Sequence, residues 1–334
     1  MKSKRKRIHA LSLALTPSRF WMLSWYNMST MSYKNYLTKE TIKTAFGVKP
    51  SKTKMNGKEI LSLSDSSKEI ARLIEGEKPF AAIKLGEAEL TCLSDAEKIK
   101  EGSSKTFDEK TRIVMKETAG YYPTTDKHLL EYANLYEGRM KNVDAIGVLG
   151  LRKEGYFVKT YAKDPLLLSG DVLNPILGGW TASLKGKKVL VIYPFIDEIQ
   201  FQYGRKDKIF KKNPQILPEF DIKLLASPMT MGEETDYRFP SFMRALEEME
   251  ARISQIDFDV ALVGCGAYGS LLALYIKSIG KKAIQTGGST QLLFGILGSR
   301  WEKAPYIQEL QNEYWIRPAT KPKGFEKVAG GAYW

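Results

Sequence analysis

The sequence contains few of the residues that build disulfide frameworks and transition-metal centres. Among 334 residues it has two cysteines, Cys92 and Cys265, and two histidines, His9 and His128. Without a CxxC pair, the cysteines predict neither a zinc site nor a disulfide framework, and they favour a reducing compartment. Because His128 lies in an expected helix with no partner motif around it, catalytic triads and histidine metal sites are not indicated.

Long apolar runs, internal repeats and low-complexity tracts are also missing. The partly apolar stretch near the start, residues 8–26, is interrupted by Pro17, Ser18 and Arg19. This interruption argues against a membrane-spanning helix, which needs about 20 consecutive apolar residues. No small-residue cleavage site follows the apolar core at residues 8–15, so the stretch is not typical of a signal peptide.

Positive charge is concentrated at the start of the chain. The first 50 residues hold ten Lys or Arg and one Glu, which leaves only +4 of the net charge of +13 for the remaining 284 residues. We therefore expect a basic, flexible arm at residues 1–50 and a folded domain at residues 51–334. No nucleic-acid-binding motif accompanies the arm, so a nucleic-acid partner is not expected.

The arm also carries apolar and aromatic residues, among them Phe20, Trp21 and Trp25. Cations next to such side chains are typical of segments that rest on anionic lipid. This pattern predicts a cytoplasmic protein that contacts the inner face of the membrane peripherally through residues 1–30. The alternative is a disordered or wrongly assigned leader, with Met28 or Met31 as the true start.

The rest of the chain alternates short apolar segments with helical patterns. Strands are expected at residues 80–85, 145–149, 187–193, 222–226, 258–263 and 282–286, and helices at residues 65–74, 127–140 and 242–253. This alternation predicts an α/β fold: a single Rossmann-like domain whose mainly parallel sheet has helices on both faces. Residues 150–186, rich in Pro and Gly, are expected to form a long inserted loop.

Two glycine turns follow the last two expected strands. The first contains Gly264, Gly266 and Gly269, and the second begins at Gly287 and Gly288. The N–H groups at a helix start are unpaired and glycine lets an anion approach them, so both turns are candidate phosphate sites. The expected phosphate contacts include Ser289 and Thr290, and the expected base or sugar contacts are Tyr268 and Gln291. The alternative is that the glycines only allow tight strand-to-helix packing.

The first turn matches GxGxxG, but a dinucleotide site needs more. The next strand, residues 282–286, ends without the Asp or Glu that would bind a ribose. Too little chain follows residue 264 for a dinucleotide-binding domain that starts there. An oxidoreductase or methyltransferase is therefore less favoured than an enzyme that binds a nucleotide sugar.

A pair of carboxylates follows the first expected strand. In the segment KLGEAE at residues 84–89, Glu87 and Glu89 would share one face of an extended chain and could both hold Mg²⁺ or Mn²⁺. Lys84 is a candidate phosphate contact beside the turn at Gly86. The alternative is that both acids are first-turn helix residues, favoured there by the helix dipole.

These segments resemble a known family. The KLGEAE segment, the block GCGAYG…GGSTQLLFGILGSRW and the ending GGAYW are similar to the GT-D class of bacterial glycosyltransferases and to GT-D-like proteins of polysaccharide clusters. The resemblance runs from about residue 65 to the end. It implies a sugar-nucleotide enzyme with its acidic motif near the diphosphate and a divalent cation. Glu87 stands where the family has Asp, Glu89 matches the family Glu, and Lys84 replaces an Arg.

Together these features predict a glycosyltransferase. It would move a sugar from a nucleoside-diphosphate donor, a UDP-sugar, to a glycan or lipid-linked acceptor in surface polysaccharide or glycoconjugate synthesis. Glu87 and Glu89 would hold Mn²⁺ or Mg²⁺ on the diphosphate. Trp180, Arg205 and Lys206 are candidates for the acceptor side. The alternative function is a catalytically inactive nucleotide-binding module in a polysaccharide system.

Overall fold

The computed structural model describes residues 54–234 and 236–334. The basic arm predicted at residues 1–50, with its expected membrane contact, lies outside these residues. Within the described part of the chain, no helix is long and apolar enough to cross a membrane.

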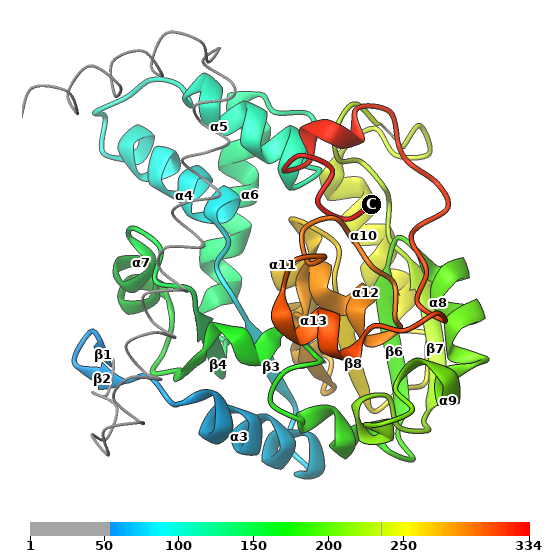
Figure 1. The fold of residues 1–334 in the computed structure, drawn as a ribbon. Helices are drawn as coiled ribbons and strands as arrows, with labels where there is room; N and C mark the ends of the chain where they lie inside the picture. The colour runs from blue at the N-terminus through cyan, green and yellow to red at the C-terminus, as the bar shows by residue number, and fades with distance from the viewer. Residues whose placement is uncertain (1–53, 235) are drawn as a thin grey trace, which may run out of the picture. The chain divides into compact units, whose positions relative to one another are not determined.

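A seven-stranded sheet forms the centre of the described domain (Figure 1). All of its strand pairs are parallel. The strand order is β5-β4-β3-β9-β8-β6-β7, where the bounds are β3 (Phe80–Ile83), β4 (Ala145–Val148), β5 (Leu166–Ser169), β6 (Lys188–Tyr193), β7 (Asp221–Ala226), β8 (Val260–Val263) and β9 (Lys282–Ile284). The predicted α/β fold with a parallel sheet is thus confirmed. A separate two-stranded antiparallel sheet pairs β1 (Lys54–Met55) with β2 (Lys58–Glu59).

Helices cover both faces of the sheet, so its central strands are buried on both sides. In β3, Ala81 and Ile83 pack into one core cluster, and Phe80 and Ala82 pack into the other. The first cluster receives side chains of α4 (Glu87–Lys100), α6 (Asp126–Met140), α7 (Glu154–Tyr161), α10 (Phe242–Ile253) and α11 (Tyr268–Ser278). The second receives side chains of α3 (Leu63–Glu75), α8 (Ile196–Tyr203), α9 (Lys206–Ile209), α12 (Thr290–Leu293) and α13 (Pro305–Leu310).

The remaining helical segments are short. They are α5 (Glu109–Ile113), a π-helical turn at Val114–Thr118, and 3₁₀ turns at Gly170–Leu173, Trp180–Leu184, Pro214–Ile216, Gly287–Ser289 and Phe325–Lys327. Only the last of these 3₁₀ turns lies in the tail after residue 317. Two helices with a clear apolar stripe begin at serine caps: the hydroxyl of Ser62 accepts from the N–H of Asp65 in α3, and that of Ser241 accepts from the N–H of Arg244 in α10.

The prediction of a long loop at residues 150–186 is wrong. This segment holds α7, the 3₁₀ turns and the edge strand β5, which pairs with β4 from Leu166 to Ser169. Three consecutive leucines after Pro165 are too short a run to distinguish a strand from a loop by periodicity. Their strand conformation comes from pairing with β4 and from packing near α3, which are tertiary contacts.

Three of the predicted site segments lie at the same end of the sheet, beyond the carboxyl ends of its strands. β3, β9 and β8 are neighbours and parallel, so the segments that follow them emerge at the same end of the sheet. The chain passes from β3 into α4 on one face and from β9 into α12 on the other. In open α/β sheets, ligands bind outside the carboxyl ends of strands where neighbouring connections diverge in this way.

Candidate functional site

Lys84 and Gly287 meet at the carboxyl ends of β3 and β9. The ammonium nitrogen of Lys84 lies 3.1 Å from the position that a Cβ on Gly287 would occupy. Gly287 has φ +60°, a left-handed conformation that glycine adopts without strain. The backbone N–H of Lys84 also donates to Oε1 of Gln285, at 2.9 Å, which ties the two strand ends together. The structure thus joins the acidic segment to the second glycine turn.

The ammonium of Lys84 has no hydrogen-bond or ion-pair partner among the described residues, although the side chain is partly buried. Burial and, to a smaller extent, the positive charge of Arg300 lower the pKa of Lys84 to about 8, against the opposing effect of the carboxylates of Glu89 and Asp171. Three charged side chains from other segments therefore lie within electrostatic reach of Lys84. A partly buried ammonium without a partner is costly, and a bound anion would relieve that cost.

Glu89 is turned toward its own helix start. Gly86 is the N-cap of α4, which makes Glu89 the third helical residue, and a Cβ on Gly86 would collide with Oε2 of Glu89. Burial raises the pKa of Glu89, while hydrogen bonds from the backbone N–H groups of Glu89 and Gly86 and the charge of Lys84 oppose that rise. A glutamate at this position that reaches back to the N-cap N–H is the capping-box arrangement. Glu89 therefore has a structural role in holding the start of α4.

The expectation that Glu87 and Glu89 share a face is wrong. It assumed an extended chain, but Glu87 is the first residue of α4, and residues two apart on a helix point about 200° apart. Burial raises the pKa of Glu87, and the neighbouring charge that lowers it belongs to Lys110, whereas the lysine beside Glu89 is Lys84. Since each carboxylate faces a different lysine, the pair does not fit a shared divalent cation. The described residues also contain no group of three or more His, Cys, Asp or Glu that could hold a metal.

The first glycine turn is filled by the chain itself. A Cβ on Gly266 would lie 2.5 Å from the carbonyl oxygen of Ala119, and the N–H of Ala267 donates to the same oxygen at 2.9 Å. Gly264 packs against the carbonyl of Gly287. Three further N–H donors of the turn bond within the protein: those of Gly264, Tyr268 and Gly269 donate to the carbonyls of Ile192, Cys265 and Gly266. This turn has the packing role, and we assign it no phosphate.

Tyr268 and Gln291 are core residues. Tyr268 is 1% exposed, and its ring stacks on Phe242 with the centroids 3.9 Å apart. Gln291 is fully buried; its Oε1 accepts from the hydroxyl of Tyr193 at 2.8 Å, and its amide donates to the carbonyls of Ile296 and Tyr333. Neither ring face nor amide is therefore presented to a ligand.

The second glycine turn is accessible at its first two residues only. Gly287 and Gly288 are partly exposed, whereas Ser289 and Thr290 are buried. The hydroxyl of Ser289 donates to the carbonyl of Thr286 at 2.7 Å, and that of Thr290 donates to the carbonyl of Gly287 at 2.6 Å. The ring of Tyr333 lies directly on Gly288, where any Cβ would collide with it. Gly287, beside Lys84, is thus the part of the turn best placed for a ligand.

Asp171 and Arg300 were not among the predicted site residues. Asp171 follows β5 in a 3₁₀ turn, where burial raises its pKa and Lys84 lowers it. Arg300 is exposed and follows α12, in a segment whose N–H groups bond to the C-terminal residues: that of Arg300 donates to the carbonyl of Ala332 at 3.1 Å. The available signal for Asp171 was an acidic residue three positions after the leucine run at residues 166–168, but β5 itself was not recognised.

The residues expected on the acceptor side are mainly used in packing. Trp180 is 1% exposed, and its Nε1 donates to the carbonyl of Val172 at 2.7 Å. The guanidinium of Arg205 donates to Oε1 of Gln202 and to the carbonyl of Tyr314, and the ammonium of Lys206 lies 3.9 Å from Asp207. These contacts give no indication of an acceptor site.

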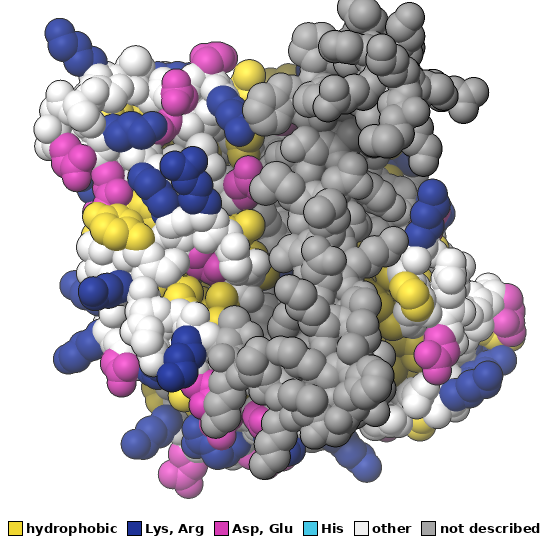
Figure 2. Space-filling model, turned by 60° about the vertical axis from the view of Figure 1, so that its left-hand side comes forward, with side chains coloured by type: hydrophobic (Ala, Val, Ile, Leu, Met, Phe, Trp, Pro, Cys, Tyr) yellow, Lys and Arg dark blue, Asp and Glu magenta, His cyan; other side chains and the backbone are white. Residues whose placement is uncertain are grey.

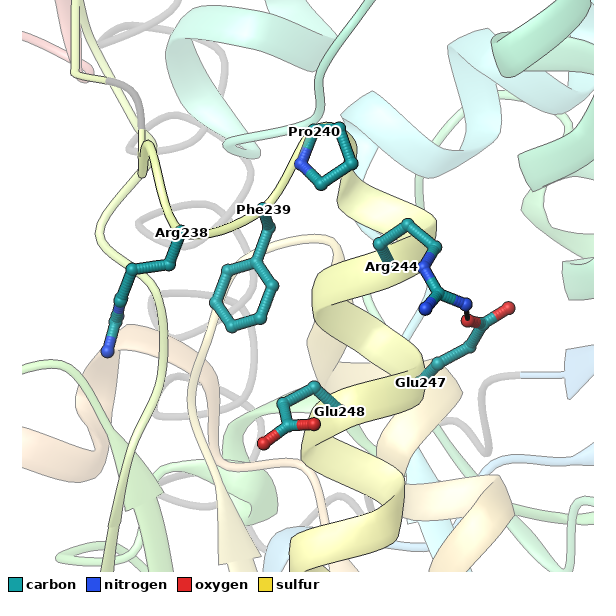
Figure 3. Close-up of a pocket in the computed structure, with 6 residues that line it drawn as sticks. All are labelled: Arg238, Phe239, Pro240, Arg244, Glu247 and Glu248. Atoms are coloured by element: carbon teal, nitrogen blue, oxygen red, sulfur yellow. Dashed lines mark hydrogen bonds and ion pairs between the residues drawn. The ribbon is translucent and has the colours of Figure 1, made fainter.

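Two hollows contain few of the predicted site residues. The larger, about 450 Å³, is an open depression between the loop Arg238, Phe239 and Pro240 and the helix α10 (Figure 3). Its charges are paired: Arg238 with Asp236, Arg244 with Glu247, and Glu248 with Arg252. The smaller, about 10 Å³, has room for about one water and is lined by residues that include Gly266, Tyr268 and Ser227. The buried hydroxyl of Ser227 lacks a hydrogen-bond partner among the described residues. The hydroxyl of Tyr268 makes no hydrogen bond of good geometry there either, although the side chain of Thr230 lies close enough to oppose the rise that burial causes in the pKa of Tyr268.

The visible surface does not gather charge of one sign. On the face drawn in Figure 2, Lys and Arg side chains lie among Asp and Glu side chains over the described part of the domain. This agrees with the small net charge that the sequence leaves beyond residue 50.

No family model and no curated protein matches the chain. Two solved structures are similar to it, both of domain of unknown function 1792, and one of them is described as having a distinct glycosyltransferase fold. The first is 14% identical to this chain, and the match covers 68% of this chain and 83% of that structure's chain. The second is 13% identical, and the match covers 68% of this chain and 82% of that structure's chain. The TM-score is 0.33 for both. A likeness this weak assigns no activity, which has to be argued from the residues.

Proposed function

We propose that this protein is a glycosyltransferase that moves a sugar from a nucleoside-diphosphate donor, a UDP-sugar, to a glycan or lipid-linked acceptor. The observation that supports this function is the ammonium of Lys84, which has no partner among the described residues and lies beside Gly287 at the carboxyl ends of β3 and β9. Arg300 brings a second positive charge within reach of Lys84. Like charges in a partly buried place repel, so an anion that contacts both stabilises the arrangement.

A sugar diphosphate suits this site better than a simple polyphosphate. The carboxylates of Glu89 and Asp171 also lie near Lys84, and they would repel a ligand that is anionic throughout. Ionised carboxylates are strong acceptors for hydroxyl groups, which a sugar offers in number. Two cations for the diphosphate and the carboxylate of Asp171 for sugar hydroxyls therefore match the two ends of a nucleotide sugar, while Glu89 stays bound to the start of α4.

The same charges are suited to sugar transfer. When the bond between the anomeric carbon and the diphosphate oxygen breaks, negative charge grows on the leaving diphosphate, while the oxygen of the acceptor hydroxyl bonds to the carbon and the hydroxyl proton is released to solvent. Lys84 and Arg300, held in place before the reaction, would stabilise that growing charge. No step of this scheme is assigned to Glu87 and Glu89 as joint ligands of a metal ion, because they point apart.

The competing function is a nucleotide-binding module without transfer activity, serving a polysaccharide system. It is favoured by the first glycine turn, which the chain fills with Ala119, and by the divergent acidic pair. Both functions require nucleotide binding, so binding alone does not distinguish them. Only the enzyme hydrolyses or transfers the sugar of its donor.

Calorimetric titration of the full-length protein with UDP, NAD and S-adenosylmethionine tests the proposal. We expect heat with UDP only, lost in Lys84→Ala and kept in Lys141→Ala, an exposed lysine at the end of α6. Release of free sugar from a panel of UDP-sugars would then identify the enzyme. Binding of NAD and not UDP overturns the proposal, and UDP binding with no sugar release or transfer leaves the inactive module as the function.

A further inference from the structure

The position of Lys84 has a consequence for how the diphosphate is neutralised. We infer that Lys84 and Arg300 supply the positive charge for the donor diphosphate, so that nucleotide binding at this site needs no divalent cation. The inference rests on the proposed function and deepens it, since it assigns the charge partner of the same site.

The first support is the geometry of the carboxylates. A hard divalent cation in a nucleotide site is usually held by one or two carboxylates together with phosphate oxygens. Here Glu87 and Glu89 lie on different sides of α4, and the carboxylate of Glu89 already contacts its own helix start at Gly86. A metal shared by both would require the first turn of α4 to unwind.

The second support is the location of the existing cation. The ammonium of Lys84 lies within electrostatic reach of both Glu89 and Asp171 and, at the same time, beside Gly287 of the second glycine turn. A metal ion bound at Glu89 would be repelled by this ammonium and by Arg300. The ammonium of Lys84 thus occupies the position between carboxylate and phosphate that a metal ion would otherwise take.

The third support is the lack of a competing partner. Among the described residues, neither Lys84 nor Arg300 forms a side-chain ion pair, in contrast to Arg139, which pairs with Glu250 at 2.6 Å. Both cations are therefore available for a ligand. The guanidinium of Arg300 stays close to the ring of Trp301, 6.0 Å from its centroid, which keeps it near the C-terminal segment.

Calorimetry of the full-length protein, treated with EDTA and desalted, tests the inference directly. UDP is titrated once in EDTA and once in Mn²⁺, with pyrophosphate and uridine as further ligands. We expect UDP to bind with the same dissociation constant, within about twofold, in both buffers, pyrophosphate to bind more weakly, and uridine not to bind. UDP binding that requires Mn²⁺ overturns this inference alone. UDP binding in neither buffer overturns the proposed function, and the inference with it.

Substitutions distinguish the contribution of Lys84 to UDP binding from that of Glu89. In EDTA, Lys84→Ala should weaken UDP binding roughly 10- to 100-fold, and Lys84→Arg should restore most of it. Glu89→Gln should leave binding unchanged or strengthen it, because it removes a negative charge near the diphosphate while its amide oxygen can still cap α4. If Glu89 were a metal ligand, the same substitution would instead abolish binding in Mn²⁺. Equal UDP affinity of Lys84→Ala and the unchanged protein, with both folded by thermal melting, would also overturn the inference.

Discussion

The carbonyl oxygen of Ala119 occupies the inner side of the turn at Gly266, 2.5 Å from the position that a Cβ would take there. Ala119 follows the π-helical turn at Val114–Thr118, far from Gly266 in sequence. In a phosphate-binding turn of this type, the inner side is where an anion approaches the N–H groups. Here the N–H of Ala267 bonds to Ala119 instead. A sequence match to GxGxxG thus marks a place where two backbone segments pack closely.

This packing predicts a large loss of stability in Gly266→Ala. The residue has φ +54°, and the added Cβ would collide with a backbone carbonyl that cannot move aside without displacing residues 119 and 120. Gly280→Ala is the matched control, because Gly280 has φ +79° and nothing within 4 Å of the added Cβ. The left-handed conformation should cost each variant about 1–2 kcal/mol, and the collision should cost Gly266→Ala about 1–3 kcal/mol more. Chemical denaturation measures both; equal losses would show that Ala119 yields without cost.

The unpaired hydroxyl of Tyr268 gives a second prediction. Removing a buried hydroxyl that has no partner should be neutral or stabilising, so Tyr268→Phe should unfold at the same denaturant concentration or a higher one. Tyr136→Phe is the control, since the hydroxyl of Tyr136 donates to Oγ of Ser270 at 3.1 Å and its loss should cost about 1 kcal/mol. UDP affinity should not change in Tyr268→Phe. A loss as large as that of Tyr136→Phe would reveal a partner, either the neighbouring side chain of Thr230 or a water in the adjacent cavity.

The parts of the fold that the sequence predicts well are those with a strong local pattern. β6 and β8 are continuous apolar runs, and α10 has its apolar residues on one stripe behind a serine cap, so their positions follow from periodicity. β5 lacks such a pattern. Its conformation depends on pairing with β4, which is a contact between segments and cannot be seen in a short window of sequence.

The site was predicted less completely for the same reason. The approach of Lys84 to Gly287 was not predicted; it follows from β3 and β9 being parallel neighbours, a strand order that the sequence does not show. The geometry of Glu87 and Glu89 was predicted wrongly, because the helix begins directly after Gly86 and leaves no extended residues between them. A glutamate three residues after a possible N-cap is the signal that favours the helical reading. The nearness of Asp171 and Arg300 to Lys84 depends on the whole tertiary structure.

Residues 1–30 give a prediction that depends on sequence alone. The cluster Lys2, Lys4, Arg5, Lys6 and Arg7 and the aromatic residues that follow should bind vesicles that contain phosphatidylserine but not vesicles of phosphatidylcholine. Co-sedimentation should be lost when residues 1–30 are deleted and weakened when the five cations are replaced by Gln, and it should fall with added salt. Unchanged vesicle binding after the deletion would assign the membrane contact to another part of the chain.

The charge of Lys84 makes nucleotide binding dependent on pH. In the free protein the pKa of Lys84 is lowered to about 8 by burial and by Arg300, against the opposing charges of Glu89 and Asp171. A bound diphosphate favours the ammonium and raises this pKa, so binding takes up a proton above pH 8 and needs none below it. UDP affinity should therefore be constant below about pH 8 and fall as the pH rises above it.

Lys84→Arg supplies the control for this dependence, because a guanidinium stays protonated throughout that range. The variant should bind UDP with an affinity that does not fall between pH 7 and pH 9, when both proteins are titrated in the same buffers with EDTA. The number of protons taken up on binding follows from the binding heat measured in buffers of different ionisation enthalpy. This number should approach one above pH 8 in the unchanged protein and stay near zero in the variant. Proton uptake that is the same in both would place the titrating group elsewhere and remove Lys84 from the diphosphate.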